Sequence, residues 1–153
     1  MKVYELMRTG FLAVRPESSV ASCCERFAVH HVGLAPVVEG ANVLVGFVTR
    51  FDLYWGYRVP PRDGRTALVR DVMTSPAVSV PEEHDVRSAA SLLSRLGLEA
   101  LPVTRAGRLV GLLSCGDLCG AVARGQLRDP LDLVLGPQPG QAGARIWRAQ
   151  RPA

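Results

Sequence analysis

An internal repeat constrains the fold of this chain more than any other feature of its sequence. A shift of 66 residues aligns identical residues in the first part of each copy: Val3 with Val69, Met7 with Met73, Val14 with Val80, and Val20 with Val86. After one extra residue in the first copy the shift becomes 65, and the agreement continues: Leu44-Val45-Gly46 with Leu109-Val110-Gly111, and Asp52-Leu53 with Asp117-Leu118. Each copy is too short to bury a core well by itself, so the two copies are expected to pack against each other.

The composition is that of a globular chain. Its 153 residues are 48% hydrophobic, enough for a sizeable core, yet no run approaches the ~18 apolar residues of a membrane span. The segment from Met1 to Arg8 is not followed by the apolar run of a signal peptide, so we expect a cytoplasmic protein with no membrane partner. The net charge of +4 rests on 17 arginines and one lysine that are spread along the chain. Because a nucleic-acid face would gather them, this distribution disfavours nucleic acid as a partner.

The cysteines do not form the pattern of a metal site. Cys23 and Cys24 are adjacent, whereas Cys115 and Cys119 are four residues apart, and neither pair has the spacing of a zinc knuckle. We therefore expect no metal site, and we interpret all four cysteines as small apolar fillers in a reducing compartment.

Helix signals occur at corresponding places in the two copies. A short apolar segment (11–14 or 77–80) precedes a stretch of helical periodicity, and the candidate N-caps are Ser19 and Asp85. Gly33 and Gly97 follow these stretches, where a helix commonly ends on a left-handed residue. The sequence therefore predicts a helix between each apolar segment and its glycine.

Two strands and a further helix complete each copy. The strands are expected at 34–38 and 43–48, and again at 100–104 and 109–113, each pair joined by a tight turn. The predicted fold class is thus α+β, with two tandem β-α-β-β-α repeats. The expected division is repeat 1 at 1–58, a Pro- and Gly-rich linker at 59–66, repeat 2 at 67–124, and a mostly extended or disordered tail at 125–153.

The most informative motif is a hydroxyl followed three residues later by an acid. Thr49 precedes Asp52 in the first copy and Ser114 precedes Asp117 in the second. This spacing is close to a capping box, which only satisfies free N–H groups at a helix start. The same geometry suits a ribose phosphate, because a helix N-terminus attracts phosphate and an ionised carboxylate accepts hydrogen bonds from a vicinal diol. Both interpretations remain open for each loop.

Taken together, the two copies resemble CBS domains, and the pair resembles a Bateman module. The resemblance covers roughly residues 3–124 and is carried by these segments: Val72-Met73-Thr74-Ser75-Pro76 with the weaker Leu6-Met7-Arg8-Thr9-Gly10, Ala35-Pro36-Val37, Leu101-Pro102-Val103, and the two segments 44–52 and 109–117. It implies two clefts between the repeats that bind adenosine-containing ligands, and often a disc-like homodimer.

The resemblance also implies which residues bind the ligand, because each pocket in this family draws on both repeats. In one pocket Ser114 and Asp117 would face residues of the first copy: Thr9, Leu12, Val32 and Gly33. In the other pocket Thr49 and Asp52 would face residues of the second copy: Ser75, Val78, Leu98 and Glu99. The apolar side chains of Leu112 and Phe47 are expected to sandwich the base.

Two positions depart from the family pattern. Glu99 stands where the family often has a basic residue, and Gly33 stands at the corresponding place in the first copy. Glu99 should repel a phosphate, whereas Arg50, inside the Thr49 loop, would attract one. We therefore expect the Thr49 and Asp52 pocket to suit a phosphate better, and occupancy of the two pockets to be unequal.

These observations favour a regulatory, non-enzymatic protein. The chain is expected to bind AMP, ADP, ATP or S-adenosylmethionine as a regulatory ligand, with no cofactor required, and to signal by a conformational change to a separate effector protein. One alternative is a ligand-free dimerisation or interaction scaffold, in which the two loops only cap helices. Another is nucleic-acid binding through the basic tail. No set of general base, nucleophile and metal stands out that would indicate an enzyme.

Overall fold

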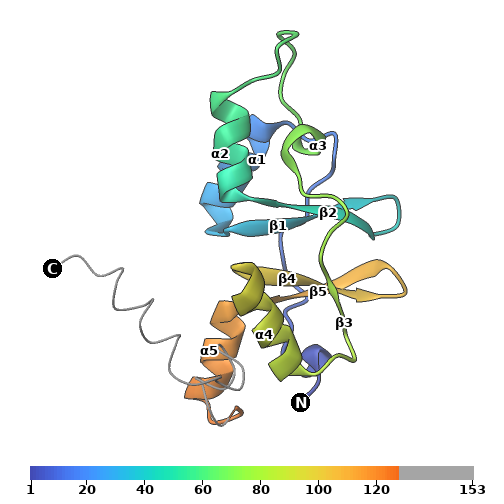
Figure 1. The fold of residues 1–153 in the computed structure, drawn as a ribbon, viewed down its shortest axis with the longest axis vertical. Helices are drawn as coiled ribbons and strands as arrows, with labels where there is room; N and C mark the ends of the chain where they lie inside the picture. Colours follow the sequence, from blue (N-terminus) through green and yellow to red (C-terminus); the bar gives the residue numbers. More distant parts are fainter. Residues whose placement is uncertain (128–153) are drawn as a thin grey trace, which may run out of the picture.

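The computed structural model describes residues 1–127 (Figure 1). Its elements in chain order are a short 3-10 helix η1 (Val3–Glu5), α1 (Val20–His30), β1 (Leu34–Glu39), β2 (Val43–Thr49), α2 (Arg50–Arg58), α3 (Val69–Val72), β3 (Val80–Pro81), α4 (Val86–Leu96), β4 (Ala100–Arg105), β5 (Arg108–Ser114) and α5 (Cys115–Ala123). The α+β class with two tandem repeats is confirmed. The predicted tail falls mainly on residues 128–153, which lie outside the described residues.

The predicted helix N-caps are confirmed. Ser19 accepts a hydrogen bond from the amide of Ser22, and Asp85 accepts from the amides of the first turn of α4. The prediction for the helix ends holds for Gly97, which is left-handed at φ 64°, but it is wrong for Gly33. The left-handed residue after α1 is His31, at φ 52°. α1 ends at His30, three residues before Gly33, and histidine is one of the non-glycine residues that tolerate the left-handed conformation.

The strands form two antiparallel hairpins, β1–β2 and β4–β5, in one sheet of order β1-β2-β5-β4-β3. The hairpins meet at a single pair, Val43 with Arg108, and otherwise lie one above the other with helices on their outer faces (Figure 1). The first predicted strand of each copy is much shorter than its apolar segment. Val14 makes one parallel bridge to Val37, and β3 covers only two residues.

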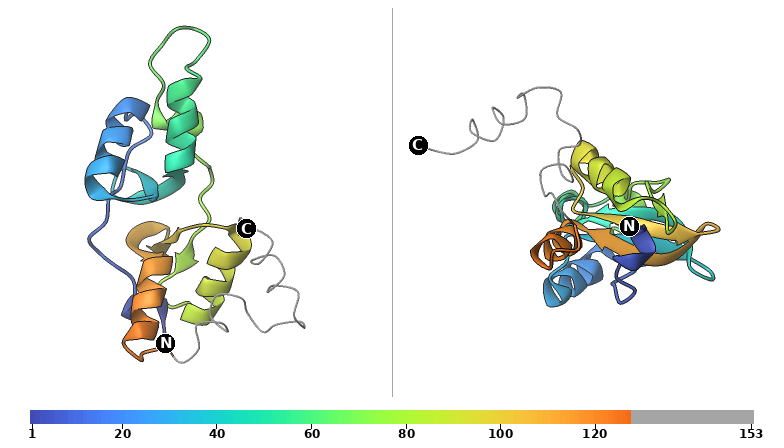
Figure 2. Two further views of the ribbon diagram at one scale, coloured as in Figure 1. Left: turned by 90° about the vertical axis from the view of Figure 1, so that its left-hand side faces the viewer. Right: turned by 90° about the horizontal axis from the view of Figure 1, so that it is seen from below.

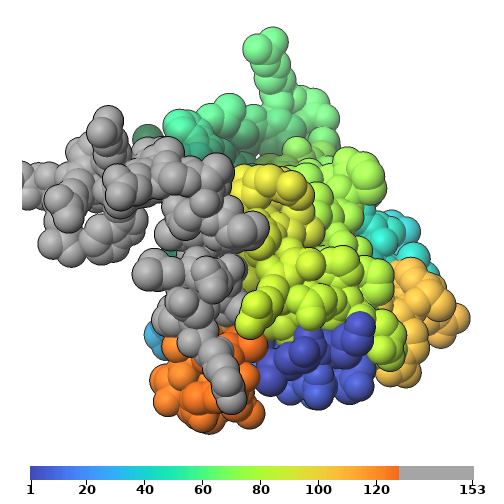
Figure 3. All heavy atoms as spheres, turned by 60° about the horizontal axis from the view of Figure 1, so that its bottom comes forward, coloured from blue at the N-terminus to red at the C-terminus, as the bar shows by residue number. Residues whose placement is uncertain are grey.

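The core of each repeat includes a segment from the other copy. The segment before the first repeat packs in the core of the second, and the segment before the second repeat packs in the core of the first. Val3 of η1 is fully buried in the core of the second repeat, where Leu6 and Met7 also pack. Val69 of α3 is fully buried in the core of the first repeat, with Met73 packed beside it. The chain therefore crosses between the repeats twice, on opposite sides of the molecule (Figure 2). Figure 3 shows the N-terminal segment seated against α4 and the second hairpin.

Gly46 and Gly111 are the places where these crossing segments touch the sheet. A Cβ on Gly46 would lie 2.6 Å from the carbonyl oxygen of Thr74, and one on Gly111 would lie 3.2 Å from that of Arg8. The next residues of β2 and β5 form bridges with the same crossing segments, Phe47 with Thr74 and Leu112 with Arg8. Glycine is therefore required at Gly46 because a backbone passes too close for a side chain, whereas at Gly111 a Cβ would meet mainly the side chain of Met7.

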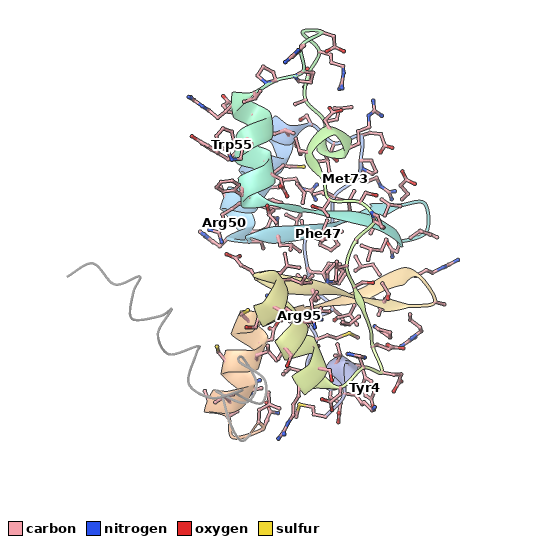
Figure 4. All side chains as sticks on the ribbon, in the orientation of Figure 1. Tyr4, Phe47, Arg50, Trp55, Met73 and Arg95 are labelled. Carbon is pink, nitrogen blue, oxygen red and sulfur yellow. The ribbon has the colours of Figure 1, made fainter. Side chains whose placement is uncertain are left out.

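A third apolar cluster joins the repeats. Its buried members come from all four long strands: Leu34, Phe47, Ala100 and Leu112. Figure 4 shows Phe47 at the level where the two hairpins face each other. The crossing segments border this cluster, so any cleft between the repeats has an apolar floor. Among residues 1–127, no helix is long and apolar enough to cross a membrane.

Candidate functional site

Both hydroxyl–acid loops form complete capping boxes. The amide of Thr49 donates to Oδ2 of Asp52 at 2.8 Å, and the amide of Asp52 donates to Oγ1 of Thr49 at 3.2 Å. Ser114 and Asp117 exchange the same bonds at the same two lengths. The capping interpretation is therefore correct for both loops. The capping box uses only Oδ2 of each carboxylate and leaves Oδ1 available, so capping does not exclude a ligand.

Arg8 takes up that remaining oxygen in the second copy. Its Nε lies 2.9 Å from Oδ1 of Asp117, and one of its terminal nitrogens donates to Oγ of Ser114 at 3.3 Å. The carboxylate of Asp117 is only 14% exposed, whereas the Arg8 side chain is 52% exposed. In the part of the chain that the structure describes, no corresponding side chain contacts Asp52. The two loops therefore share a backbone geometry but differ in charge.

Arg8 also lines a cleft of about 650 Å³ between the repeats, which we call the Arg8 cleft. Its wall is formed by both repeats and by the first crossing segment: Arg8, Gly10, Phe11, Leu12, Ala13, Arg26, His30, Val32, Leu34 and Leu112. The predicted ligand-binding residues Leu12, Val32 and Leu112 are thus brought together, and Arg8 connects them to Ser114 and Asp117. Thr9 is exposed between two residues that line the cleft.

The Thr49 loop has a different environment. Arg50, at the start of α2, donates to both carboxylate oxygens of Glu99, each at 3.0 Å (Figure 4). Gly33 lies directly beneath this ion pair, because a Cβ there would collide with both side chains. The pair neutralises the positive charge on which the expected phosphate preference of this loop depends.

The remaining predicted residues of the second pocket have varied environments. Phe47 and Leu98 belong to the apolar cluster between the repeats. Ser75 donates its hydroxyl to the carbonyl oxygen of Val45 at 2.8 Å, and Val78 is exposed. The binding role of these residues stays a prediction.

Sequence reasoning missed two basic side chains of the Arg8 cleft. Arg26 and His30 stand four residues apart on α1 and therefore share one face of that helix. Arg26 also reaches the carbonyl oxygen of Ala13 in the first crossing segment, at 3.4 Å. The signal that could have found them was the comparison between copies, since a shift of 66 residues places Leu92 and Leu96 at their positions.

The cysteines differ more than predicted. Cys23 is buried in the core of the first repeat, and burial raises the pKa of its thiol, so the filler interpretation holds there. It is wrong for Cys115 and Cys119, which are exposed on α5 because their helix is covered by the core on its other face only. Within residues 1–127 no group of three or more His, Cys, Asp and Glu side chains could hold a metal ion.

A second surface feature lies on α2. Its aromatic side chains are largely exposed: Phe51, Tyr54, Trp55 and Tyr57 (Figure 4). Phe51 and Tyr54 each pack edge-to-face on Trp55, at 6.0 and 5.8 Å between ring centroids. A groove of about 510 Å³ runs between α1 and α2 beside them.

Comparisons with known proteins agree with this geometry. The CBS domain family model matches residues 3–55 and 69–124, so the chain belongs to the CBS domain family. The structure of CBSX2 in complex with AMP superposes with a TM-score of 0.73 at 27% identity, covering 82% of this chain and 98% of that one. The CBS domain pair of protein MJ0100 has a TM-score of 0.69 at 18% identity over 80% and 99% of the two chains, which supports the fold.

Sequence relatives include enzymes and proteins of unknown role. Inosine-5'-monophosphate dehydrogenase of Korarchaeum cryptofilum is 32% identical over 108 residues, and the match covers 70% of this chain but only 21% of the dehydrogenase. The uncharacterized protein YlbB of Bacillus subtilis is 30% identical, over 76% of this chain and 79% of YlbB. The likeness to the dehydrogenase is therefore confined to about a fifth of that enzyme.

Proposed function

We propose that this chain is a regulatory module that binds an adenosine-containing nucleotide between its repeats and transmits binding to a partner protein. The observation that carries the proposal is the position of Asp117, whose Oδ1 lies beyond its capping box and is paired with Arg8, a residue that lines the cleft. A carboxylate beside an apolar cleft can accept both hydroxyls of a ribose, while the cleft holds the base. The likeness to CBSX2, whose structure contains AMP, supports an adenine ligand.

The arrangement of the repeats supports a conformational signal. A ligand in the Arg8 cleft would contact residues of both repeats, and the two hairpins pair directly only at Val43 and Arg108. A ligand that binds one relative orientation of the repeats more tightly shifts the population toward it. A partner that reads that orientation would respond without any chemical step on this chain, which is why we propose no enzymatic activity.

Calorimetric titration with adenosine, AMP, ADP, ATP and S-adenosylmethionine tests the proposal. The protein is first freed of carried-over ligand, and wild type is compared with Asp117→Ala and Asp52→Ala. Both variants lose the same capping box, so melting curves control for stability. Saturable binding that is lost only in Asp117→Ala supports the proposal. A folded wild type that binds none of these compounds contradicts it.

A ligand-free interaction scaffold is the second candidate, and the exposed aromatic side chains of α2 favour it. Self-association through this surface would bury Trp55 and its neighbours. Sedimentation of wild type beside Trp55→Ser, with and without nucleotide, distinguishes the two functions. A dimer that depends on Trp55 in a protein that binds no nucleotide would favour the scaffold.

A further inference from the structure

The two halves of the molecule differ in positive charge at equivalent positions. Three basic side chains line the Arg8 cleft: Arg8, Arg26 and His30. The same positions in the other copy, 66 residues later, hold neutral side chains: Thr74, Leu92 and Leu96. The correspondence also holds in the structure. Arg8 forms a β-bridge with Leu112 of β5, and Thr74 forms the equivalent β-bridge with Phe47 of β2.

Ion pairs occur on both sides of the molecule. Near the Thr49 loop Arg50 is paired with Glu99, and at the Arg8 cleft Arg8 is paired with Asp117, so neither pair adds net positive charge. In the Arg8 cleft, Arg26 makes only a long hydrogen bond to a carbonyl oxygen, and its charge stays uncompensated by any acid that the structure places in contact with it. The start of α5 lies beside Arg8 and adds the positive end of a helix dipole.

We infer that the Arg8 cleft is a polyphosphate site, which makes the chain selective for a nucleoside di- or triphosphate over a monophosphate, with one such site per chain. This inference rests on the proposed function for the nucleoside part of the ligand, and on the three basic side chains for the phosphates. Arginine side chains suit phosphate because their planar N–H groups match its oxygens.

Arg8 has a double role in this inference. It holds Asp117 through an ion pair at 2.9 Å, so a ribose can reach that carboxylate only if Arg8 releases it. Arg8 then has a phosphate as its new partner in a di- or triphosphate ligand. Adenosine offers no such partner. Arg8 therefore opposes binding of the nucleoside alone and favours binding of the polyphosphate.

Titration of the full chain with four probes tests this inference: inorganic triphosphate, adenosine, AMP and ATP. At low salt ATP is expected to bind about tenfold or more tightly than AMP, at one molecule per chain, and to weaken steeply as salt rises. Arg26→Gln should weaken ATP and triphosphate about tenfold and leave adenosine unchanged. Arg8→Ala should weaken ATP but leave adenosine equal or tighter. Arg62→Ala, which removes an exposed arginine of the linker, is the matched control.

Each result bears on a separate claim. If AMP and ATP bind equally and Arg26→Gln changes neither, the polyphosphate site is wrong even though the nucleotide function stands. If Arg26→Gln weakens the binding of inorganic triphosphate, but the adenosine part of ATP adds no affinity over triphosphate, the anion site stands and the adenine ligand is wrong. Loss of ATP binding in Asp52→Ala but not in Arg26→Gln would place the site in the other cleft and overturn the inference.

Discussion

The glycines that admit the crossing segments give the sharpest test of the fold. In Gly46→Ala the new Cβ would lie 2.6 Å from the carbonyl oxygen of Thr74 and 3.2 Å from the sulfur of Met73. That carbonyl accepts a hydrogen bond from the amide of Phe47 at 3.1 Å, and the amide of Thr74 donates to the carbonyl oxygen of Phe47 at 2.9 Å, so Thr74 is fixed to β2 through both of its backbone groups. The oxygen therefore cannot retreat unless the crossing segment moves away from β2.

The expected cost follows from two opposing effects. Overpacking a filled site costs about 1–3 kcal/mol. Replacing glycine by alanine recovers about 0.4–1 kcal/mol, because the unfolded chain loses freedom and φ at this position is not left-handed. Gly46→Ala should thus lower the free energy of unfolding by about 1–2 kcal/mol, which corresponds to a Tm lower by about 2–8 °C for a chain of this size.

Gly111→Ala is the matched control. Its Cβ would meet mainly the flexible side chain of Met7, with Cγ at 2.9 Å, while the nearest backbone oxygen, that of Arg8, is 3.2 Å away. Methionine can repack, so the expected cost is about 0–1 kcal/mol. Urea unfolding curves of the two variants measure the difference. A Gly111→Ala variant that is less stable than Gly46→Ala, or a Gly46→Ala variant as stable as wild type, would refute the close backbone contact as the reason for glycine.

Two further stability predictions concern polar contacts. Asp52→Ala removes the acceptor for the amide and hydroxyl of Thr49, so thermal melts should show a loss of about 0.5–1.5 kcal/mol, and an unchanged Tm would contradict the capping geometry. The hydrogen-bonded guanidinium of Arg105 lowers the pKa of Glu82 below its usual value, so the folded state gains stability above the unfolded pKa and loses it as the pH falls through the folded pKa. Glu82→Gln should therefore be less stable at pH 7 and show a flatter decline of Tm between about pH 5 and pH 3; an equally steep decline would argue against this pair.

Local features of the fold were predictable because their causes lie within a few residues. The N-caps Ser19 and Asp85 follow from one side chain and the amides of the next turn. The hairpin turns follow from residues such as Gly40 and Gly107, both with positive φ. The error at the end of α1 is of the same local kind: helix periodicity extended the helix to Gly33, whereas His31 already takes the left-handed conformation.

The exchange of segments between the repeats could not be predicted from the local sequence, and only the family resemblance implied that each pocket draws on both repeats. Val3 and Met7 have the same apolar character whether they pack on the first repeat or on the second. The contact between Arg8 and Asp117 joins positions 109 residues apart, and it exists only because of that exchange. The sequence assigned the phosphate preference to Arg50 because Arg50 lies inside the Thr49 loop, and that preference stays a prediction.

The comparison of the two copies separates what the fold needs from what each cleft can bind. Positions that are identical or similar in both copies have structural reasons in this molecule: the glycines Gly46 and Gly111 admit a backbone, and the acids Asp52 and Asp117 close a capping box. Their repetition is therefore evidence for the fold and says little about the ligand. The charged positions differ instead, with Arg8 opposite a threonine and the second copy's Glu99 opposite a glycine. Since the backbone at these places is alike, the differences act on which ligand each place can accept, and the Arg8 cleft and the Thr49 loop should not bind the same ligand equally.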